Sequence, residues 1–259
     1  MIVALLTALV LTACSAPGGR EITVSAAASL TFAFEEIAPL YEAETGVHPV
    51  LNFASSGHLA HQIAAGAPVD VFASANVAYI DELRGQGLVD TASARTFCRG
   101  RLVVWTRRDE PAPVRNLADL AEARVGRFAM ANPEHAPYGA AARQALQQLN
   151  LWTALQPKLV LGETVRQALH YGERGDVAAA LVSLSVAADS DGQWREVPDS
   201  LHAPIEHAVA AVAGRPKLAA ARRFVAFLDS PAGRHAIERH GFIVPGAAQR
   251  GAAEPGITP

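Results

Sequence analysis

The sequence has few cysteines and no excess of positive charge. Of its two cysteines, Cys14 lies in an N-terminal segment that we interpret as processed, which leaves Cys98 as a lone thiol. No disulfide framework can be built from one thiol. Charged residues make up 18% of the chain and the formal net charge is -3. The chain therefore lacks the basic field that nucleic-acid binding requires, and we expect no nucleic-acid partner.

The motifs of common enzyme classes are also missing. The sequence contains no nucleophile elbow, no phosphate loop and no zinc-binding helix motif. Its histidines are scattered, and His58 and His61, which share a predicted helix face, are better explained as solvated or locally hydrogen-bonded side chains than as a metal pair. Cys98 is better explained as a packed thiol than as a nucleophile. We expect a protein that is not an enzyme and holds no free metal cation.

The N-terminal segment, residues 1–20, has the features of an export signal. Residues 2–13 form an apolar run that is too short to span a bilayer. Leu11-Thr12-Ala13-Cys14 then resembles the bacterial lipobox, in which the cysteine is acylated, and residues 15–19 would be a tether. An ordinary signal peptide with a chance cysteine, or a buried first strand, stays open, because the usual positive residues before the apolar run are absent. We expect an exported lipoprotein, periplasmic or at the cell surface, that meets the membrane only through lipid on Cys14.

From Glu21 onward, hydrophobic patterning alternates between strand and helix periods, which predicts an α/β architecture with mostly parallel sheets. The predicted strands cover residues 22–27, 47–53, 69–73, 101–106, 125–131, 158–161, 177–182 and 206–213. The predicted helices cover residues 30–45, a short segment ending at Gly66, 77–84, 138–149, 165–173, a segment around Phe224–Leu228, and 231–240. Residues 109–113 look like a turn-rich joint into a second unit, and residues 246–259 like a disordered tail.

At three places a predicted strand ends and small hydroxyl or glycine residues lead directly into a helix. These junctions contain Ser29, Ser56 and Thr164. The first-turn N–H groups of a helix lack internal partners and carry the positive end of its dipole, so such junctions can bind anions. Each could equally be an ordinary helix cap, and Gln167 completes a capping box with Thr164 that still leaves the Val165 N–H free. Together they predict a binding protein without identifying its ligand.

The same junctions carry a resemblance to a known family. The segments concerned are Ala26–Thr31, Phe53–Gly57, Gln62–Ala75, the Asn132-Pro133-Glu134-His135 turn, and Val165–Leu169. In these segments the sequence, from about Glu21 to Phe242, resembles the periplasmic molybdate-binding proteins of ABC transporters.

This resemblance implies a type II periplasmic-binding-protein fold, in which two lobes, each a mostly parallel sheet flanked by helices, are joined by a two-strand hinge. Residues 21–103 and 206–245 would form lobe 1, and residues 104–205 lobe 2. The implied ligand is molybdate or tungstate, bound without a cofactor by the hydroxyls of Ser29 and Ser56 and the backbone N–H groups of Tyr138 and Val165. A family tyrosine falls at Ser183. The implied protein is a monomer that delivers its ligand to a membrane permease.

The sequence departs from the family at two ligand positions. Tyr138 stands where a small residue is usual, and Ser183 replaces the tyrosine. Ser183, a water or the Tyr138 hydroxyl could substitute for the lost phenol, or the preferred anion differs. A site made only of donors favours a fully deprotonated anion, because a protonated one would bury a hydroxyl without an acceptor at a cost of about 1 to 3 kcal/mol. Molybdate, tungstate and sulfate all meet this condition. An enzyme or a sensor on the same fold is the other alternative.

Overall fold

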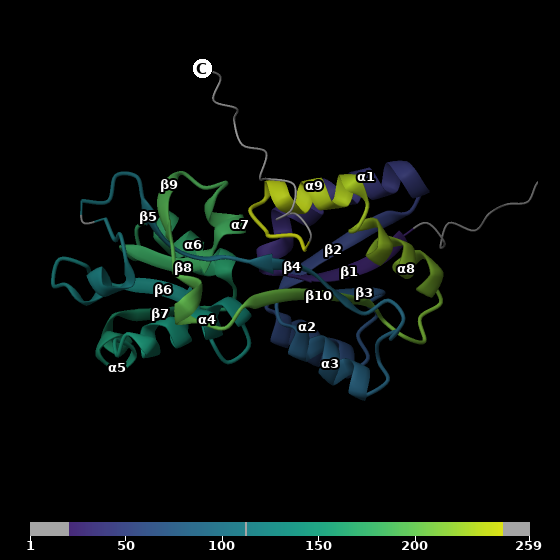
Figure 1. The fold of residues 1–259 in the computed structure, drawn as a ribbon, viewed down its shortest axis with the longest axis horizontal. Helices are drawn as coiled ribbons and strands as arrows, with labels where there is room; N and C mark the ends of the chain where they lie inside the picture. Colours follow the sequence, from purple (N-terminus) through teal and green to yellow (C-terminus); the bar gives the residue numbers. More distant parts are fainter. Residues whose placement is uncertain (1–20, 112, 246–259) are drawn as a thin grey trace, which may run out of the picture.

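The computed structural model describes residues 21–111 and 113–245, which form two lobes placed side by side (Figure 1). The signal, lipobox and tail predicted for residues 1–20 and 246–259 lie outside the described residues. Each lobe contains one five-stranded sheet with helices on its faces. The predicted two-lobed α/β fold is therefore confirmed.

The sheet of lobe 1 has the order β2-β1-β3-β10-β4. β1 pairs in parallel with β2 and β3, whereas β10 runs antiparallel to both of its neighbours, so four strands share one direction. Its strands are β1 (Glu21–Ala27), β2 (His48–Ala54), β3 (Val71–Ser74), β4 (Arg95–Gly100) and β10 (Ile205–Ala211).

The sheet of lobe 2 repeats this arrangement in the order β7-β6-β8-β5-β9. β6 pairs in parallel with β7 and β8, and β5 runs antiparallel to β8 and β9. Its strands are β5 (Leu102–Arg107), β6 (Phe128–Ala131), β7 (Leu159–Gly162), β8 (Ala179–Ser183) and β9 (Gly192–Glu196). In both sheets the antiparallel strand, β10 or β5, is the one that enters from the other lobe.

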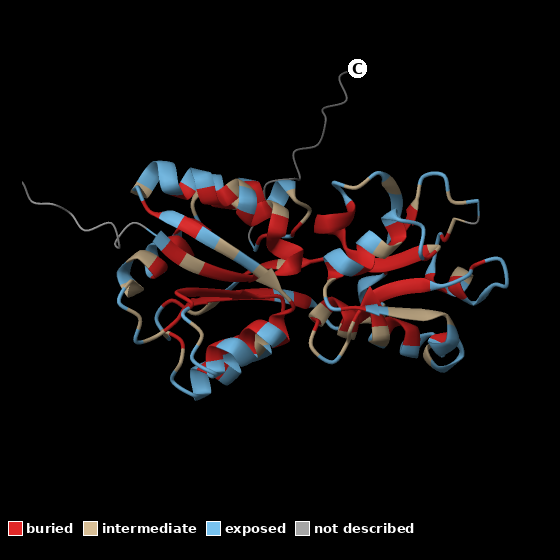
Figure 2. Ribbon diagram, turned by 180° about the vertical axis from the view of Figure 1, so that it is seen from behind, coloured by how far each residue is buried: buried red, intermediate tan, exposed pale blue. Residues whose placement is uncertain are grey.

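Helices cover both faces of the lobe 1 sheet, and the side chains of each strand alternate between the two resulting cores. Val71 and Ala73 belong to one hydrophobic cluster and Phe72, between them, to the other. Figure 2 shows the strands of both lobes largely buried and the outer helix faces exposed. The helices of lobe 1 are α1 (Thr31–Thr45), α2 (Ser56–Ala64), α3 (Val77–Gly85), α8 (Leu218–Phe227) and α9 (Pro231–Arg239). Those of lobe 2 are α4 (Pro137–Gln148), α5 (Trp152–Leu155), α6 (Val165–Glu173) and α7 (Leu184–Ala187).

Short 3₁₀ turns complete the chain: η2 (Ala28–Leu30), η3 (Leu117–Ala121), η4 (Gln156–Lys158) and η5 (Asp199–Leu201). Gly46 ends α1 in the left-handed region with a φ of 69°. Asn76 caps α3 by accepting a hydrogen bond from the Ala78 N–H at 2.9 Å. Asp70, with its side chain 3% exposed, accepts one from the Thr23 N–H at 2.8 Å, so both residues have a structural role in lobe 1.

The chain crosses between the sheets at Arg101, between β4 and β5, and again in the segment before β10. The expectation that residues 109–113 join the two units was wrong, because this segment follows β5 inside lobe 2. The expected lobe boundary after residue 103 stays a prediction, although Leu102 and Val103 already pair with β8.

Two strands and two short helices among the described residues were not predicted: β4, β9, α5 and α7. β4 and β9 carry polar and charged residues, and both lie at sheet edges where such residues reach solvent. No helix among the described residues is long and apolar enough to cross a membrane.

Candidate functional site

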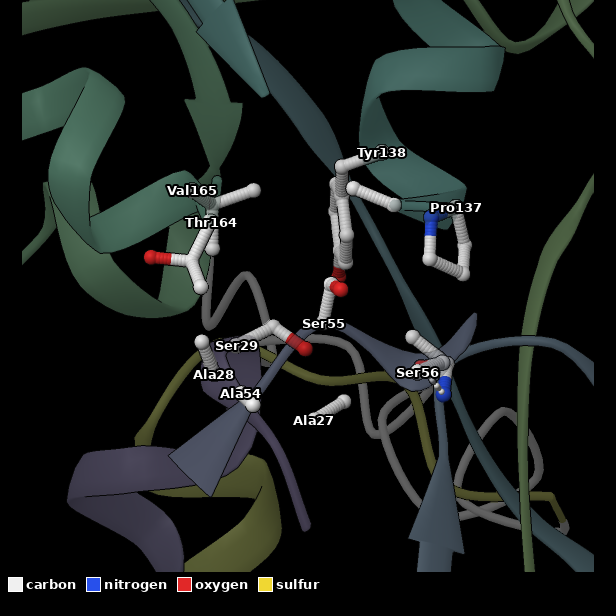
Figure 3. Close-up of a pocket in the computed structure, with 12 residues that line it drawn as sticks. Ala27, Ala28, Ser29, Ala54, Ser55, Ser56, Pro137, Tyr138, Thr164 and Val165 are labelled. Carbon is white, nitrogen blue, oxygen red and sulfur yellow. Dashed lines mark hydrogen bonds between the residues drawn. The ribbon is translucent and has the colours of Figure 1, made fainter. Parts of the chain in front are cut away.

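A small cavity lies between the lobes, at the carboxyl ends of the parallel strands (Figure 3). Ligands bind at this edge in open α/β sheets. The cavity receives the ends of β1, β2 and β3 from lobe 1, and the starts of α4 and α6 from lobe 2. It is lined by Ala27, Ala28, Ser29, Ala54, Ser55, Ser56, Ala75, Ala136, Pro137, Tyr138, Thr164 and Val165. None of these residues carries a charged side chain.

Four of the five predicted ligand residues meet at this cavity: Ser29, Ser56, Tyr138 and Val165. Two serines come from lobe 1, and the other two residues come from lobe 2. The structure does not bring the fifth, Ser183, to the cavity. Ser183 ends β8, is fully buried, and has its Oγ 3.0 Å from that of Ser185.

Ser183 instead helps to hold Ser29 in place, through Ser185. The Ser185 hydroxyl donates to the Ser29 carbonyl at 2.7 Å, and since a carbonyl can only accept, the Ser185 proton is used there. The 3.0 Å contact between the two serine oxygens then requires Ser183 to donate to Ser185. The pair fixes the backbone of the η2 turn from the lobe 2 side.

Ser56 is the first residue of α2 and does not act as a helix cap. Its Oγ accepts a hydrogen bond from the Ala75 N–H at 2.9 Å, which leaves its proton to be donated elsewhere. Neither α2 nor α4 has a side-chain cap at its N-terminus, so their first-turn N–H groups are not occupied in that way. Ser29 likewise does not cap a helix, because the N-cap residues of η2 and α1 are Ala27 and Leu30. The alternative that these serines are ordinary caps is therefore wrong for Ser29 and Ser56.

Thr164 is a true cap. Its Oγ accepts from the Gln167 N–H at 3.2 Å, as the capping box predicted. The Gln167 side chain, however, accepts from the Glu163 N–H rather than from Thr164. Val165, the first residue of α6, lines the cavity.

Ser29 lies on η2 directly after β1 and is held by a histidine that sequence reasoning missed. The Ser29 Oγ is 3.1 Å from Nε2 of His207, whose Nδ1 is 3.2 Å from the Ile205 carbonyl. Because that carbonyl can only accept, Nδ1 carries the proton and Nε2 of the neutral ring accepts from Ser29. Complete burial lowers the pKa of His207 to about 3, so the ring stays neutral near pH 7. No motif in the sequence signals this contact, because His207 lies on β10, 178 residues away.

Tyr138 reaches from α4 into lobe 1. Its ring lies 5.9 Å from that of His207, and its hydroxyl packs against Gly100, where an added Cβ would lie only 1.8 Å from the phenol oxygen. The hydroxyl is buried beside the Ser29 side chain but makes no hydrogen bond of normal geometry to the described residues. Burial also raises the pKa of the phenol well above its usual range, so it is a neutral donor. A buried hydroxyl without a partner is costly, which indicates that a ligand or water supplies one.

Direct hydrogen bonds between the lobes hold the cavity closed. The Gly57 N–H, in the first turn of α2, donates to the His135 carbonyl at 2.9 Å, and the Ser55 Oγ lies 2.9 Å from His135 Nδ1. His135 belongs to the Asn-Pro-Glu-His turn before α4. The same rim brings together His58, His135 and Glu163, the one group of this kind among the described residues that could hold a metal ion.

Comparison with known proteins gives a consistent set of relatives. Residues 22–243 match the family model of bacterial extracellular solute-binding proteins. The chain is 38% identical over 232 residues to the molybdate-binding protein ModA of Escherichia coli (strain K12), covering 86% of this chain and 89% of that one. It is 31% identical to a putative ABC transporter substrate-binding lipoprotein of Bacillus subtilis (strain 168), covering 85% of each. Its fold matches the periplasmic molybdate-binding protein of Azotobacter vinelandii with a TM-score of 0.81 at 28% identity, over 86% of this chain and 99% of that one.

Gly57→Ala is expected to prevent full closure of the lobes. A Cβ at this position would lie 2.9 Å from both the backbone oxygen and the Cβ of His135. This clash is relieved only if the opposite lobe, which carries His135, moves away. Small-angle scattering with saturating ligand should show a larger radius of gyration than for the parent. Gly85→Ala, where an added Cβ meets nothing within 4 Å, is the control. Equal radii for all three proteins would show that this contact does not limit closure.

His207 is expected to make the protein less stable as the pH falls. Its pKa is lowered from 6.5 to about 3 in the folded protein. Below pH 6.5 the unfolded chain therefore binds a proton at His207 that the folded chain does not bind. The free energy of unfolding is thus unaffected by His207 above pH 6.5 and falls by about 1.4 kcal/mol for each pH unit between pH 6.5 and pH 3. Urea unfolding at pH 7 and pH 5 should show a smaller loss for His207→Phe than for the parent. The exposed His61→Gln should behave as the parent, and an unchanged loss in His207→Phe would contradict the assignment.

Proposed function

Since the chain belongs to the family of bacterial extracellular solute-binding proteins, which bind rather than transform their ligands, we propose that it captures molybdate or tungstate in the cavity between its lobes. The observation that carries the proposal is the convergence of uncharged donors from both lobes on one closed cavity without a charged side chain. The donors are the hydroxyls of Ser29 and Ser56, and the first-turn N–H groups of Tyr138 and Val165. Relatives that bear the name molybdate-binding protein support the choice of ligand.

The physics of the donor set favours a dianion without protons. Helix starts and hydroxyls stabilise negative charge, and helix dipoles contribute about 0.3 to 1 kcal/mol each. No acceptor side chain faces the cavity except the hydroxyls, so a proton on the ligand would have no carboxylate to bind. Discrimination among molybdate, tungstate and sulfate then depends on how well the oxygens of each anion reach donors in opposite lobes.

The Tyr138 hydroxyl is the best substitute for the phenol that the family resemblance placed at Ser183. It is buried beside the cavity with no partner, whereas Ser183 is committed to Ser185. A small rotation of the ring would turn the phenol proton toward an anion held by Ser29. The same fold retuned to another small anion is the second candidate, and the unusual placement of this phenol is the observation that favours it.

Delivery to a membrane permease is part of the proposal. An anion that contacts both lobes favours the closed form, and a permease can recognise that form. We further propose that the chain is a monomeric, exported lipoprotein anchored through Cys14, in the periplasm or at the cell surface. The lipobox and the Bacillus subtilis relative described as a lipoprotein support this anchor.

Thermal unfolding with added anions tests the ligand. Molybdate or tungstate should raise the melting temperature more than sulfate, phosphate or small carboxylates, because a ligand at 100 times its Kd adds about 2.7 kcal/mol to stability. The double variant Ser29→Ala with Ser56→Ala should lose this rise. Ser93→Ala, which removes a buried hydroxyl that accepts from Ala211 and lies away from the cavity, should keep it. A double variant that binds as the parent does would refute the site.

Tyr138→Phe tests the phenol separately. We expect the affinity for molybdate to fall about tenfold, which corresponds to one hydrogen bond to a charged group of about 1.4 kcal/mol. The melting temperature without ligand should stay equal or rise, because an unpartnered buried hydroxyl is removed. Tyr41→Phe is the control with the opposite pattern, since its hydroxyl donates to the Ala220 carbonyl at 3.0 Å, so stability should fall and affinity should not. An unchanged affinity in Tyr138→Phe, measured by calorimetry, would remove the phenol from the site.

A further inference from the structure

We propose that His58, His135 and Glu163 form a site for a divalent transition-metal ion of the Zn²⁺ type, which bridges the two lobes at the rim of the cavity and holds them closed. His58 lies in the first turn of α2 in lobe 1. His135 and Glu163 belong to lobe 2, in the turn before α4 and directly after β7. No single element carries two of these side chains, so the site exists only when the lobes meet.

The distances fit a metal site that needs a small contraction. Glu163 Oε2 lies 3.4 Å from His135 Nε2 and 3.8 Å from His58 Nδ1, and the three candidate ligand atoms all lie within 4.8 Å of one another. Ligand atoms around a tetrahedral Zn²⁺ are about 3.4 Å apart, given bonds of about 2.0 to 2.1 Å. The His135–Glu163 pair already has this separation, and the third atom belongs to the exposed His58 side chain, which can move inward.

The chemistry of the ligands selects the class of ion. Two imidazole nitrogens and one carboxylate suit Zn²⁺ and its neighbours in the first transition series, with a fourth position left for water. Ca²⁺ and Mg²⁺ prefer sites made of oxygen atoms.

A hydrogen bond already orients one of the ligands. His135 has its Nδ1 2.9 Å from the Ser55 Oγ, which leaves Nε2 directed to Glu163. Histidines that bind metals usually donate their second ring N–H to such a partner, and this partner tunes metal affinity. The His58 ring stacks on that of His135 at a centroid distance of 3.9 Å. His58, the metal ligand from lobe 1, is therefore also held close to His135.

The cluster lies next to the anion cavity in sequence and in space. Glu163 precedes Thr164, His58 follows Ser56 by two residues, and His135 precedes Ala136, and these three neighbours line the cavity. Ser55 is shared, because it lines the cavity and bonds His135. A cation at the rim and a dianion in the cavity would both favour the closed lobes and attract each other. By linkage, each must then raise the affinity for the other by the same factor.

Titration of the untagged, EDTA-treated protein with Zn²⁺, and with Co²⁺ as an absorbing probe, tests the metal site without any anion. We expect one ion per chain and a higher melting temperature, with no comparable effect of Mg²⁺. His58→Ala and Glu163→Gln, at side chains 45% and 64% exposed, should fold as the parent and lose at least tenfold in Zn²⁺ affinity. His61→Ala, on an exposed part of the same helix, should bind Zn²⁺ as the parent does. Absent Zn²⁺ binding, or binding unaffected in Glu163→Gln, would overturn the proposal.

A second titration, of molybdate with and without saturating Zn²⁺, tests the bridge between the lobes. We expect Zn²⁺ to raise molybdate affinity several-fold in the parent and in His61→Ala, but not in Glu163→Gln. Zn²⁺ binding with no effect on molybdate affinity would refute closure by the metal. If molybdate and the other anions fail to bind at all, the proposed function fails, whereas the Co²⁺ titration still decides whether the metal site exists.

Discussion

The whole arrangement depends on unoccupied backbone donors at helix starts that meet only when two lobes close. Parallel strands place the starts of α2, α4 and α6 at the same edge of their sheets, so geometry alone brings positive helix ends to one cavity. At α2 and α4 no side chain satisfies these donors. The Gly57 N–H of α2 is satisfied by the His135 carbonyl of the other lobe. At the remaining first-turn donors an anion or water can take the place of a cap, which connects the fold to anion binding.

The sequence predicted those parts of the structure that depend on local pattern. Strand and helix periods predicted the order of most elements, and the Thr164 cap was correctly assigned from Gln167, three positions away. β4 and β9 escaped because their polar residues lie at sheet edges, where hydrophobic patterning is not required. The family resemblance then predicted the pairing of Ser29 and Ser56 with groups in the second lobe, which no local pattern could supply.

Contacts between distant segments could not be predicted from one sequence. His207 supports Ser29 across 178 residues, and His58 meets His135 and Glu163 only across the closed cleft. Metal-ligand spacing along the chain relates His58 only to His61 on the same helix, whereas its partners lie in the other lobe. Ser183 was expected at the cavity on the basis of resemblance, whereas in the structure it contacts Ser185, which donates to the Ser29 carbonyl.

The two serines are not equivalent donors, although they occupy corresponding places after β1 and β2. Ser29 already donates to the neutral His207, so donating to an anion means exchanging one acceptor for another, and part of the gain is lost with the broken hydrogen bond. Ser56 instead accepts from the Ala75 N–H while its proton stays available, and a hydroxyl that accepts one hydrogen bond becomes a stronger donor in the next. Ser56 should therefore contribute the larger share of hydroxyl binding energy. Ser29, which is hydrogen-bonded to His207 and Ser185, chiefly fixes the position of the anion.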